Sequence, residues 1–110
     1  MARITALRGE IWLADLGMIQ KTRPVLILSV AYKDDERALV TFVGRTTSLR
    51  GTEYEIPHTA SRFDPGAFDA QGISSLPDAQ LIRRLSVCDA ETLEKVEVAV
   101  MKWLGLRCDA

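Results

Sequence analysis

The sequence predicts a mainly β, α+β fold, in which a C-terminal α-helix closes the open side of a small, strongly curved antiparallel barrel or half-barrel. Three observations predict it. Short apolar or alternating runs follow one another between turn-forming residues, and the last clear element repeats its apolar residues at helical spacing. The regular alternation of strand and helix that builds parallel sheets is absent.

The predicted strands of the first half are short. Residues 8–16, RGEIWLADL, alternate with a period near two and predict the first strand. Residues 24–30, PVLILSV, are apolar on both faces, which predicts a central second strand that starts at a proline. Residues 38–45, ALVTFVGR, predict a third strand after a charged hairpin loop. A fourth, half-exposed strand over residues 53–56 is expected to stop at Pro57, which gives an antiparallel meander.

The next segment is less regular. Residues 58–72 are rich in turn formers and predict a loop, which Phe63 and Phe68 pin to the body of the protein. Two short strands are expected on either side of Pro77, the second over residues 79–87, AQLIRRLSV.

The pattern that follows predicts a helix over residues 89–104. Asp89 can cap its N-terminus and Gly105 can end it. The residues that recur at helical spacing are Leu93, Val96, Val100, Trp103 and Leu104. Because the sheet is the only large partner for this apolar stripe, we assign Trp103 to the core.

The composition and the net charge limit the kinds of protein that this chain can be. The 110 residues, 47% apolar and 26% charged, predict one folded domain over 1–110. Fourteen basic against 15 acidic residues give a net charge of −1, which excludes a strongly basic nucleic-acid-binding surface, so that any phosphate site must be local. We find neither a signal-peptide pattern nor a run that approaches a membrane span, and we expect a cytoplasmic protein without membrane contact.

The cysteines predict neither a metal site nor a disulfide framework. Cys88 and Cys108 lack a CxxC spacing and a histidine partner, so two reduced thiols are expected. We therefore predict no metal and no cofactor.

Arg23 is the first candidate functional residue. It precedes a proline, which favours an extended backbone and aims its side chain, and its planar donors match a phosphate or a carboxylate. Residues 45–48, RTTS, end the third predicted strand, and a hairpin would bring them to the edge where Arg23 lies. A joint site is one interpretation. The alternative is that Arg23 forms a surface ion pair with Asp15, Glu53 or Glu55 and that the threonines only suit a strand.

Several stretches, in order along nearly the whole chain, resemble the MazF/PemK family of type II toxin endoribonucleases. They are RGEIWLADL, KTRPVLILS, TTS followed by TEYEI, QLIRRLS and LEKVEVAVMKWLGL, and the stretch FDAQGISSLPDAQLIRRL is similar to the PemK-like branch. The resemblance implies an SH3-like barrel, a homodimer, a cognate antitoxin, and growth inhibition through metal-independent, sequence-specific cleavage of single-stranded RNA.

The resemblance also implies site residues. The arginine before the proline and the threonine that ends the next strand correspond to Arg23 and Thr46 as the catalytic pair, with Thr47 as the near alternative for the second place. The residues expected to bind RNA are Lys21, Thr47, Ser48 and Arg50. Family members commonly carry a longer loop with a glutamate before the arginine, whereas GMIQKT is short and has no acid.

The implied reaction is attack of a 2′-hydroxyl on phosphorus, which leaves a 2′,3′-cyclic phosphate and a 5′-hydroxyl. A guanidinium is a poor base, because making Arg23 neutral at pH 7 costs on the order of 7 kcal/mol. We therefore assign Arg23 to a phosphate clamp and proton donor, and the Thr46 hydroxyl or N–H to a non-bridging oxygen. The group that takes the 2′-proton stays open, and His58 is interpreted as a surface or hydrogen-bonded histidine.

The remaining charged and aromatic candidates each have two interpretations. Lys21, Arg45 and Arg50 either steer the RNA backbone or act as solubilising charges. Trp12 and Tyr54 either stack on bases or pack within the protein. A non-catalytic barrel similar to CcdB, which binds a protein target such as gyrase, is the competing function, and a purely structural domain or antitoxin-bound remnant is a third.

Overall fold

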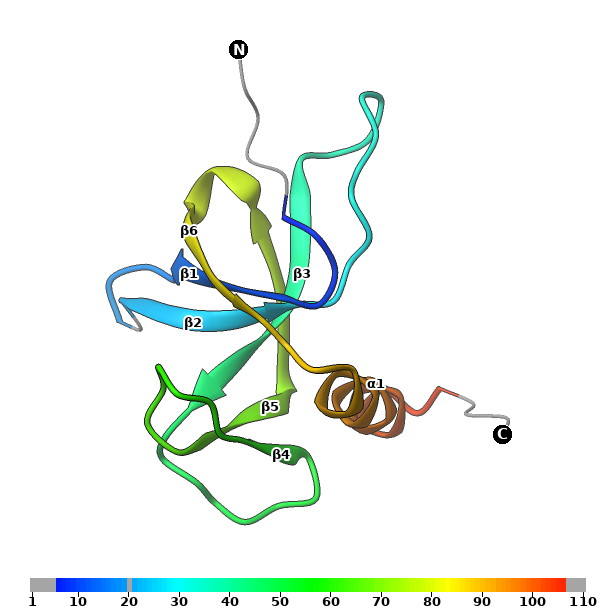
Figure 1. Ribbon diagram of the computed structural model, residues 1–110. Coiled ribbons are helices and arrows are strands. Elements are labelled where there is room, and N and C mark those ends of the chain that lie inside the picture. The colour runs from blue at the N-terminus through cyan, green and yellow to red at the C-terminus, as the bar shows by residue number, and fades with distance from the viewer. Residues whose placement is uncertain (1–5, 20, 107–110) are drawn as a thin grey trace.

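The computed structural model describes residues 6–19 and 21–106 and contains one antiparallel sheet and one long helix (Figure 1). The strands are β1 (Glu10–Asp15), β2 (Thr22–Ile27), β3 (Leu39–Thr46), β4 (Glu55–His58), β5 (Gly66–Pro77) and β6 (Leu81–Val87). A 3-10 turn (Asp78–Gln80) joins β5 to β6, and the helix α1 (Ala90–Leu104) ends the described chain. The predicted α+β class is confirmed.

The six strands lie in the order β4-β5-β3-β2-β1-β6, with every pair antiparallel. The meander is therefore confirmed for β1 to β3 only, because β5 lies between β3 and β4. Figure 1 shows β1 and β2 side by side, with the long strands β3 and β5 crossing behind them. The sheet is curved, and the pairing of β5 with β3 shifts between Phe42 and Gly44, which places a bulge at the bend.

Three predicted boundaries are wrong. In each case the pairing with neighbouring strands, which the local sequence does not show, decides where the strand begins or ends. β2 starts before its proline, and it pairs with β3 only from Val25 onward, so the missing N–H of Pro24 has no partner to lose on that side. β4 includes Pro57, which an edge strand tolerates. The predicted loop over 58–72 contains the first half of β5, and Phe68 is a fully buried strand residue.

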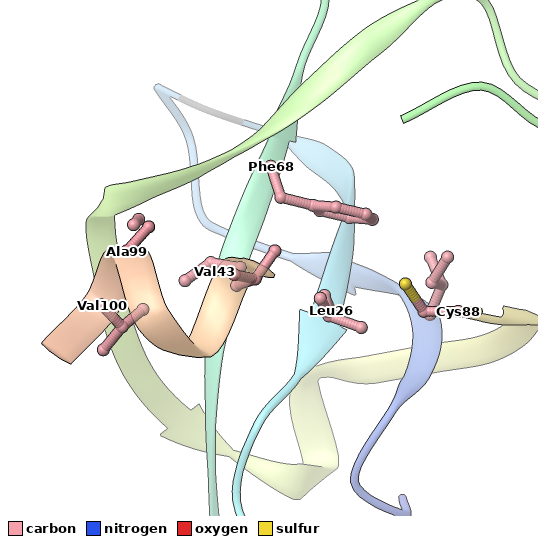
Figure 2. Packing of buried hydrophobic residues seen from close by; sticks show 9 residues of the cluster. Leu26, Val43, Phe68, Cys88, Ala99 and Val100 are labelled. Atoms are coloured by element: carbon pink, nitrogen blue, oxygen red, sulfur yellow. The ribbon is translucent and has the colours of Figure 1, made fainter. Parts of the chain in front are cut away.

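Both faces of the central strand β2 are buried, as predicted. Val25, Leu26 and Ile27 have no exposed surface. Leu26 faces the helix-side cluster, which comprises Ile11, Leu26, Val43, Phe68, Ala70, Cys88, Val96, Ala99 and Val100. The opposite face belongs to the far-side cluster, which comprises Ala6, Ala14, Val25, Ile27, Val40, Phe42, Leu76 and Leu81. Figure 2 shows side chains of the sheet and of α1 meeting in the helix-side cluster. The sheet therefore has a core on each of its two faces.

The helix α1 has the predicted caps. The Asp89 carboxylate accepts the N–H of Thr92 at 2.9 Å, and Gly105 has the left-handed φ of 70° that ends many helices. The assignment of Trp103 to the core is wrong, because this residue is 44% exposed. Only Val96, Ala99 and Val100 of the helix are buried. The apolar stripe therefore extends along the helix beyond the part that the sheet covers. Trp103 instead meets the edge of the Tyr54 ring, with 5.4 Å between ring centroids.

Within the described ranges, we find no helix whose length and hydropathy would suit a membrane crossing.

Candidate functional site

A groove of about 720 Å³ lies across the face of the sheet where β2, β3 and β5 meet. We call it the β2–β3–β5 groove. The lining residues that matter below are Arg23, Gly44, Thr46, Thr47, Ser48 and Asp69. Its lining therefore contains five of the residues that the sequence nominated, Arg45 among them, from β2, from β3 and from the turn that follows β3.

The strand register places Arg23 and Thr46 next to each other across β2 and β3. Val25 is paired with Gly44, and the next position on the same face of each strand is Arg23 on β2 and Thr46 on β3. Because side chains alternate along a strand, both project from the face that carries the groove. The proposed catalytic pair therefore shares one open surface.

The Arg23 guanidinium is exposed and has no ion pair or hydrogen bond to any residue within 6–19 and 21–106. Each carboxylate that the surface ion pair would use has another partner. Asp15 accepts the N–H of Gly17 at 3.0 Å, and Glu53 pairs with Lys102 at 2.5 Å. Glu55 accepts the N–H of Arg50 at 2.9 Å. No ion pair between Arg23 and these three carboxylates is formed, and no residue of the described ranges occupies its donors, which can therefore bind an anion.

The hydroxyl of Thr46 is held by the turn that follows β3. Its Oγ accepts the N–H of Ser48 at 3.0 Å, while the contact from the Thr46 hydroxyl to the Ser48 carbonyl is long at 3.4 Å. Such a turn occupies a lone pair of the hydroxyl and leaves its O–H to donate. Thr47 and Ser48 are exposed beside it. This end of the groove is thus rich in donors.

Gly44 forms the floor of the groove. A Cβ built on this glycine would meet nothing within 4 Å, so the position opens onto free space. The register places it between Val25 on β2 and Asp69 on β5. Asp69 is half-buried, and its Oδ1 accepts the N–H of Gln71 at 3.1 Å. A ligand can therefore approach the backbone of β3 between a guanidinium and a carboxylate.

The contribution of β5 to the groove was missed because residues 58–72 were predicted to be a loop. The available signal was the alternation of buried Phe68 and Ala70 with the polar Asp69 and Gln71. It was weak because turn-forming residues surround it and the bulge interrupts the strand.

Two of the predicted RNA-binding residues lie outside the groove lining. Lys21 is exposed in the turn between β1 and β2, where its φ of 57° is unusual for a residue with a side chain. Its N–H donates to the Gly17 carbonyl at 2.7 Å. Arg50 is exposed in the loop after β3. The structure thus brings together Arg23, Thr46, Thr47 and Ser48 and leaves both cations apart.

Arg45 is neither an exposed RNA-steering cation nor a solubilising charge, because it is 5% exposed. Its Nε donates to His58 Nδ1 at 2.9 Å, and its Nη2 donates to the carbonyls of His58 and Asp64 at 2.8 and 2.6 Å. Burial lowers the pKa of Arg45, although the Asp64 carboxylate opposes the effect. His58 is also 5% exposed and accepts this bond, so it is a hydrogen-bonded histidine and not a surface one.

The aromatic candidates pack within the protein. Trp12 is half-buried against the far-side cluster and donates its Nε1–H to Glu10 at 2.9 Å. Tyr54 packs against the helix-side cluster. Neither lines the groove, so their role in packing is the better interpretation.

No group of three metal-ligating side chains occurs within the described part of the chain. Burial raises the pKa of the Cys88 thiol to about 11, with the Asp89 carboxylate adding to the effect, so that this cysteine stays protonated at neutral pH. Cys108 lies outside the described residues.

Several solved structures share the fold of this chain. An endoribonuclease from a mycobacterial species is 27% identical, with a TM-score of 0.78 over 94% of this chain and 95% of that one. A mycobacterial endoribonuclease solved with its cognate antitoxin is 28% identical, with a TM-score of 0.81 over 94% and 99%. MazF from Deinococcus radiodurans shares the fold at 22% identity, with a TM-score of 0.81 over 94% of this chain and 100% of that one.

No curated protein matches the chain. The model of one protein family, described as PemK-like, MazF-like toxin of type II toxin-antitoxin system, matches residues 7–104. Because that match spans nearly the whole sequence, the chain belongs to the PemK-like, MazF-like family of toxins of type II toxin–antitoxin systems.

Proposed function

We propose that this protein is a sequence-specific endoribonuclease toxin that cleaves single-stranded RNA without a metal ion. The observation that carries the proposal is the shared groove of Arg23 and Thr46, with the guanidinium unpaired within the described residues. Two mycobacterial proteins with this fold are named endoribonucleases at 27% and 28% identity. A barrel that acts only by docking a protein needs no such pair of groups in one groove.

The proposed reaction assigns a role to each of these groups. The 2′-oxygen attacks phosphorus, the bond from phosphorus to the 5′-oxygen breaks, and the products are a 2′,3′-cyclic phosphate and a 5′-hydroxyl. Arg23 holds the phosphoryl oxygens with its planar donors and can protonate the leaving oxygen. The Thr46 O–H donates to a non-bridging oxygen. Of the lining side chains, the carboxylates of Asp15 and Asp69 have the chemistry to accept the 2′-proton.

The proposal includes two protein partners in the cytoplasm, a cognate antitoxin and a second copy of the chain. The antitoxin is supported by family membership and by the mycobacterial relative solved with its own antitoxin. A homodimer is supported by the family resemblance and by β6, an edge strand on which Ile82 and Val87 are 49% and 65% exposed. An edge strand with exposed apolar side chains is a surface that proteins usually cover.

The test is cleavage of single-stranded RNA in the presence of EDTA. The wild type should cleave, and Arg23→Ala or Thr46→Ala should lower kcat by about 100- to 1,000-fold, the usual cost of one transition-state donor. Arg37→Ala is the control, because Arg37 is exposed and does not line the groove. An RNA with 2′-deoxyribose at the cleaved position should stay intact, since it lacks the nucleophile.

Induced expression in a bacterium gives a second measurement. The wild type should arrest growth, and Arg23→Ala and Thr46→Ala should relieve the arrest. RNA that stays intact with every variant would overturn the assignment, and growth arrest that persists in both variants would favour a toxin that acts by binding a protein target.

A further inference from the structure

The proposed reaction does not use the buried pair Arg45 and His58, although Arg45 directly precedes Thr46 in the chain. A buried guanidinium is unfavourable unless hydrogen bonds replace its water. The hydrogen bonds of the Arg45 side chain therefore indicate what this residue does in the structure. The pair lies at the end of β3, immediately behind the donor-rich end of the groove.

The Arg45 side chain connects three segments. It extends from β3, bonds the ring and the carbonyl of His58 at the end of β4, and bonds the carbonyl of Asp64 in the loop before β5. The Phe63 ring lies 4.9 Å from its central carbon. These contacts hold the end of β3 against β4 and the loop, and of the residues that line the groove only Arg45 takes part in them.

The start of β5 closes the same site tightly. A Cβ on Gly66 would lie 2.5 Å from the Thr46 carbonyl oxygen and 2.8 Å from Arg45 Nη1, so only a glycine fits there. Gly66 thus packs closely against both the backbone of Thr46 and the Arg45 guanidinium.

The bond between the two side chains requires one protonation state. His58 Nδ1 accepts from Arg45 Nε, so it carries no proton and the proton of the neutral ring is on Nε2. Protonation of Nδ1 would place two donors against each other and a second positive charge beside a buried guanidinium. The bond is therefore lost when His58 becomes charged.

We propose that Arg45 and His58 are positioning residues: their buried hydrogen bond holds the end of β3, and with it the donors of Thr46–Ser48, in register with Arg23, and protonation of His58 releases them. This inference rests on the proposed ribonuclease function for its activity measurement only. The structural part concerns the end of β3 and can be tested without any RNA.

The charges that face His58 decide where it titrates. Burial and the Arg45 guanidinium lower its pKa from the ordinary 6.5, and the Asp89 carboxylate before α1 opposes them. Asp64 faces the other side of Arg45, and Cys88 beside Asp89 stays protonated. As the pH drops, His58 is protonated in the unfolded chain at a higher pH than in the folded protein. The free energy of unfolding therefore falls as the pH drops below 6.5, and it continues to fall down to the lowered pKa. Cleavage should be lost over the lower part of that window.

The first experiment compares pH profiles of cleavage. His58 is the only histidine in the chain, and in His58→Asn the amide oxygen can replace Nδ1 as the acceptor without titrating. We expect wild-type kcat to fall about tenfold per pH unit below the His58 pKa, and His58→Asn to keep the neutral rate without that acid limb. His58→Phe keeps a ring but no acceptor and should lower kcat on the order of tenfold or more at pH 7.5, with KM little changed.

The second experiment follows the wild-type protein by NMR without RNA. The amide signals of Thr46, Thr47 and Ser48 should shift with the same midpoint as the His58 ring, and their hydrogen exchange should accelerate below it. The inference is overturned if these amides do not follow His58, or if His58→Asn retains the wild-type acid limb. Absence of cleavage at every pH would instead reject the proposed function, while the NMR result would still decide the inference.

Discussion

At the start of β1, the Glu10 carboxylate shows how one buried charge organises its neighbours. It accepts the N–H of Leu7 at 2.8 Å and the Nε1–H of Trp12 at 2.9 Å, and it pairs with Arg84 at 3.2 Å. Burial acts to raise the pKa of Glu10, but these hydrogen bonds together lower it. The carboxylate thus ties β1 to β6 and orients Trp12.

Replacing Glu10 by alanine should therefore destabilise the fold. The N–H groups of Leu7 and Trp12 would lose their acceptor, which costs about 1–3 kcal/mol for partly buried donors. Glu94→Ala is the matched control, because Glu94 is exposed on α1 and should change stability by no more than about 0.5 kcal/mol. Urea unfolding followed by circular dichroism measures both. Equal midpoints for the two variants would contradict a structural role for Glu10.

At the scale of elements, the helix α1 is specified almost entirely by local sequence. The Asp89 carboxylate accepts both the N–H and the hydroxyl of Thr92 at 2.9 Å, and Gly105 ends the helix. Its buried residues are Val96, Ala99 and Val100, and the partly buried Leu93 also packs against the helix-side cluster. The ends of the helix thus depend on residues next to it in the chain, whereas the packing of its apolar stripe depends on the sheet.

Removing the cap should test the local part. Asp89→Ala is expected to lower the free energy of unfolding by about 0.5–2 kcal/mol, because the first turn of α1 loses its acceptor. Asp89→Asn keeps a capping oxygen and should remain within a few tenths of a kcal/mol of the wild type. Thermal unfolding compares the two. A loss in Asp89→Asn as large as in Asp89→Ala would show that charge, rather than the cap, is what Asp89 contributes.

At the scale of the whole molecule, the groove exists only because strands distant in sequence adjoin. Gly44 is its floor, and β2 and β5 provide the walls on either side. Gly66 is the contrasting glycine, since it packs against the backbone of Thr46 behind the groove. Gly44 leaves open space in the groove for a ligand, whereas Gly66 allows the close approach of the Thr46 backbone.

Substituting these two glycines should separate binding from folding. Gly44→Val places its side chain in open space on a strand, so stability should hold while RNA cleavage falls on the order of tenfold or more. Gly66→Ala forces a Cβ against the Thr46 carbonyl and should cost about 1–3 kcal/mol. Chemical unfolding and RNA cleavage are measured for both. Undiminished cleavage by Gly44→Val would place the RNA elsewhere.

Much of the fold could be predicted from the sequence because patterns among neighbouring residues specify several of its strands and its helix. The period of two in β1, the apolar run of β2 and the helical spacing of α1 each follow from neighbouring residues. The first half of β5 could not be predicted, since a bulge and turn-forming residues mask its alternation, and only its partners β3 and β4 make it a strand. Trp103 shows the same limit, because a periodic stripe does not reveal where its partner surface ends.

By itself, the sequence determined the class of fold, the family resemblance and the nomination of Arg23 and Thr46. The tertiary structure alone decided which arginine is open and which is buried: Arg23 is unpaired among the described residues in the groove, whereas Arg45 is held by His58 and Asp64. Both are arginines on strands, and although Arg23 precedes a proline, no neighbouring residue shows which of the two is buried. Burial is set by segments that fold back from far along the chain, so a local pattern can propose a charged group but not its surroundings.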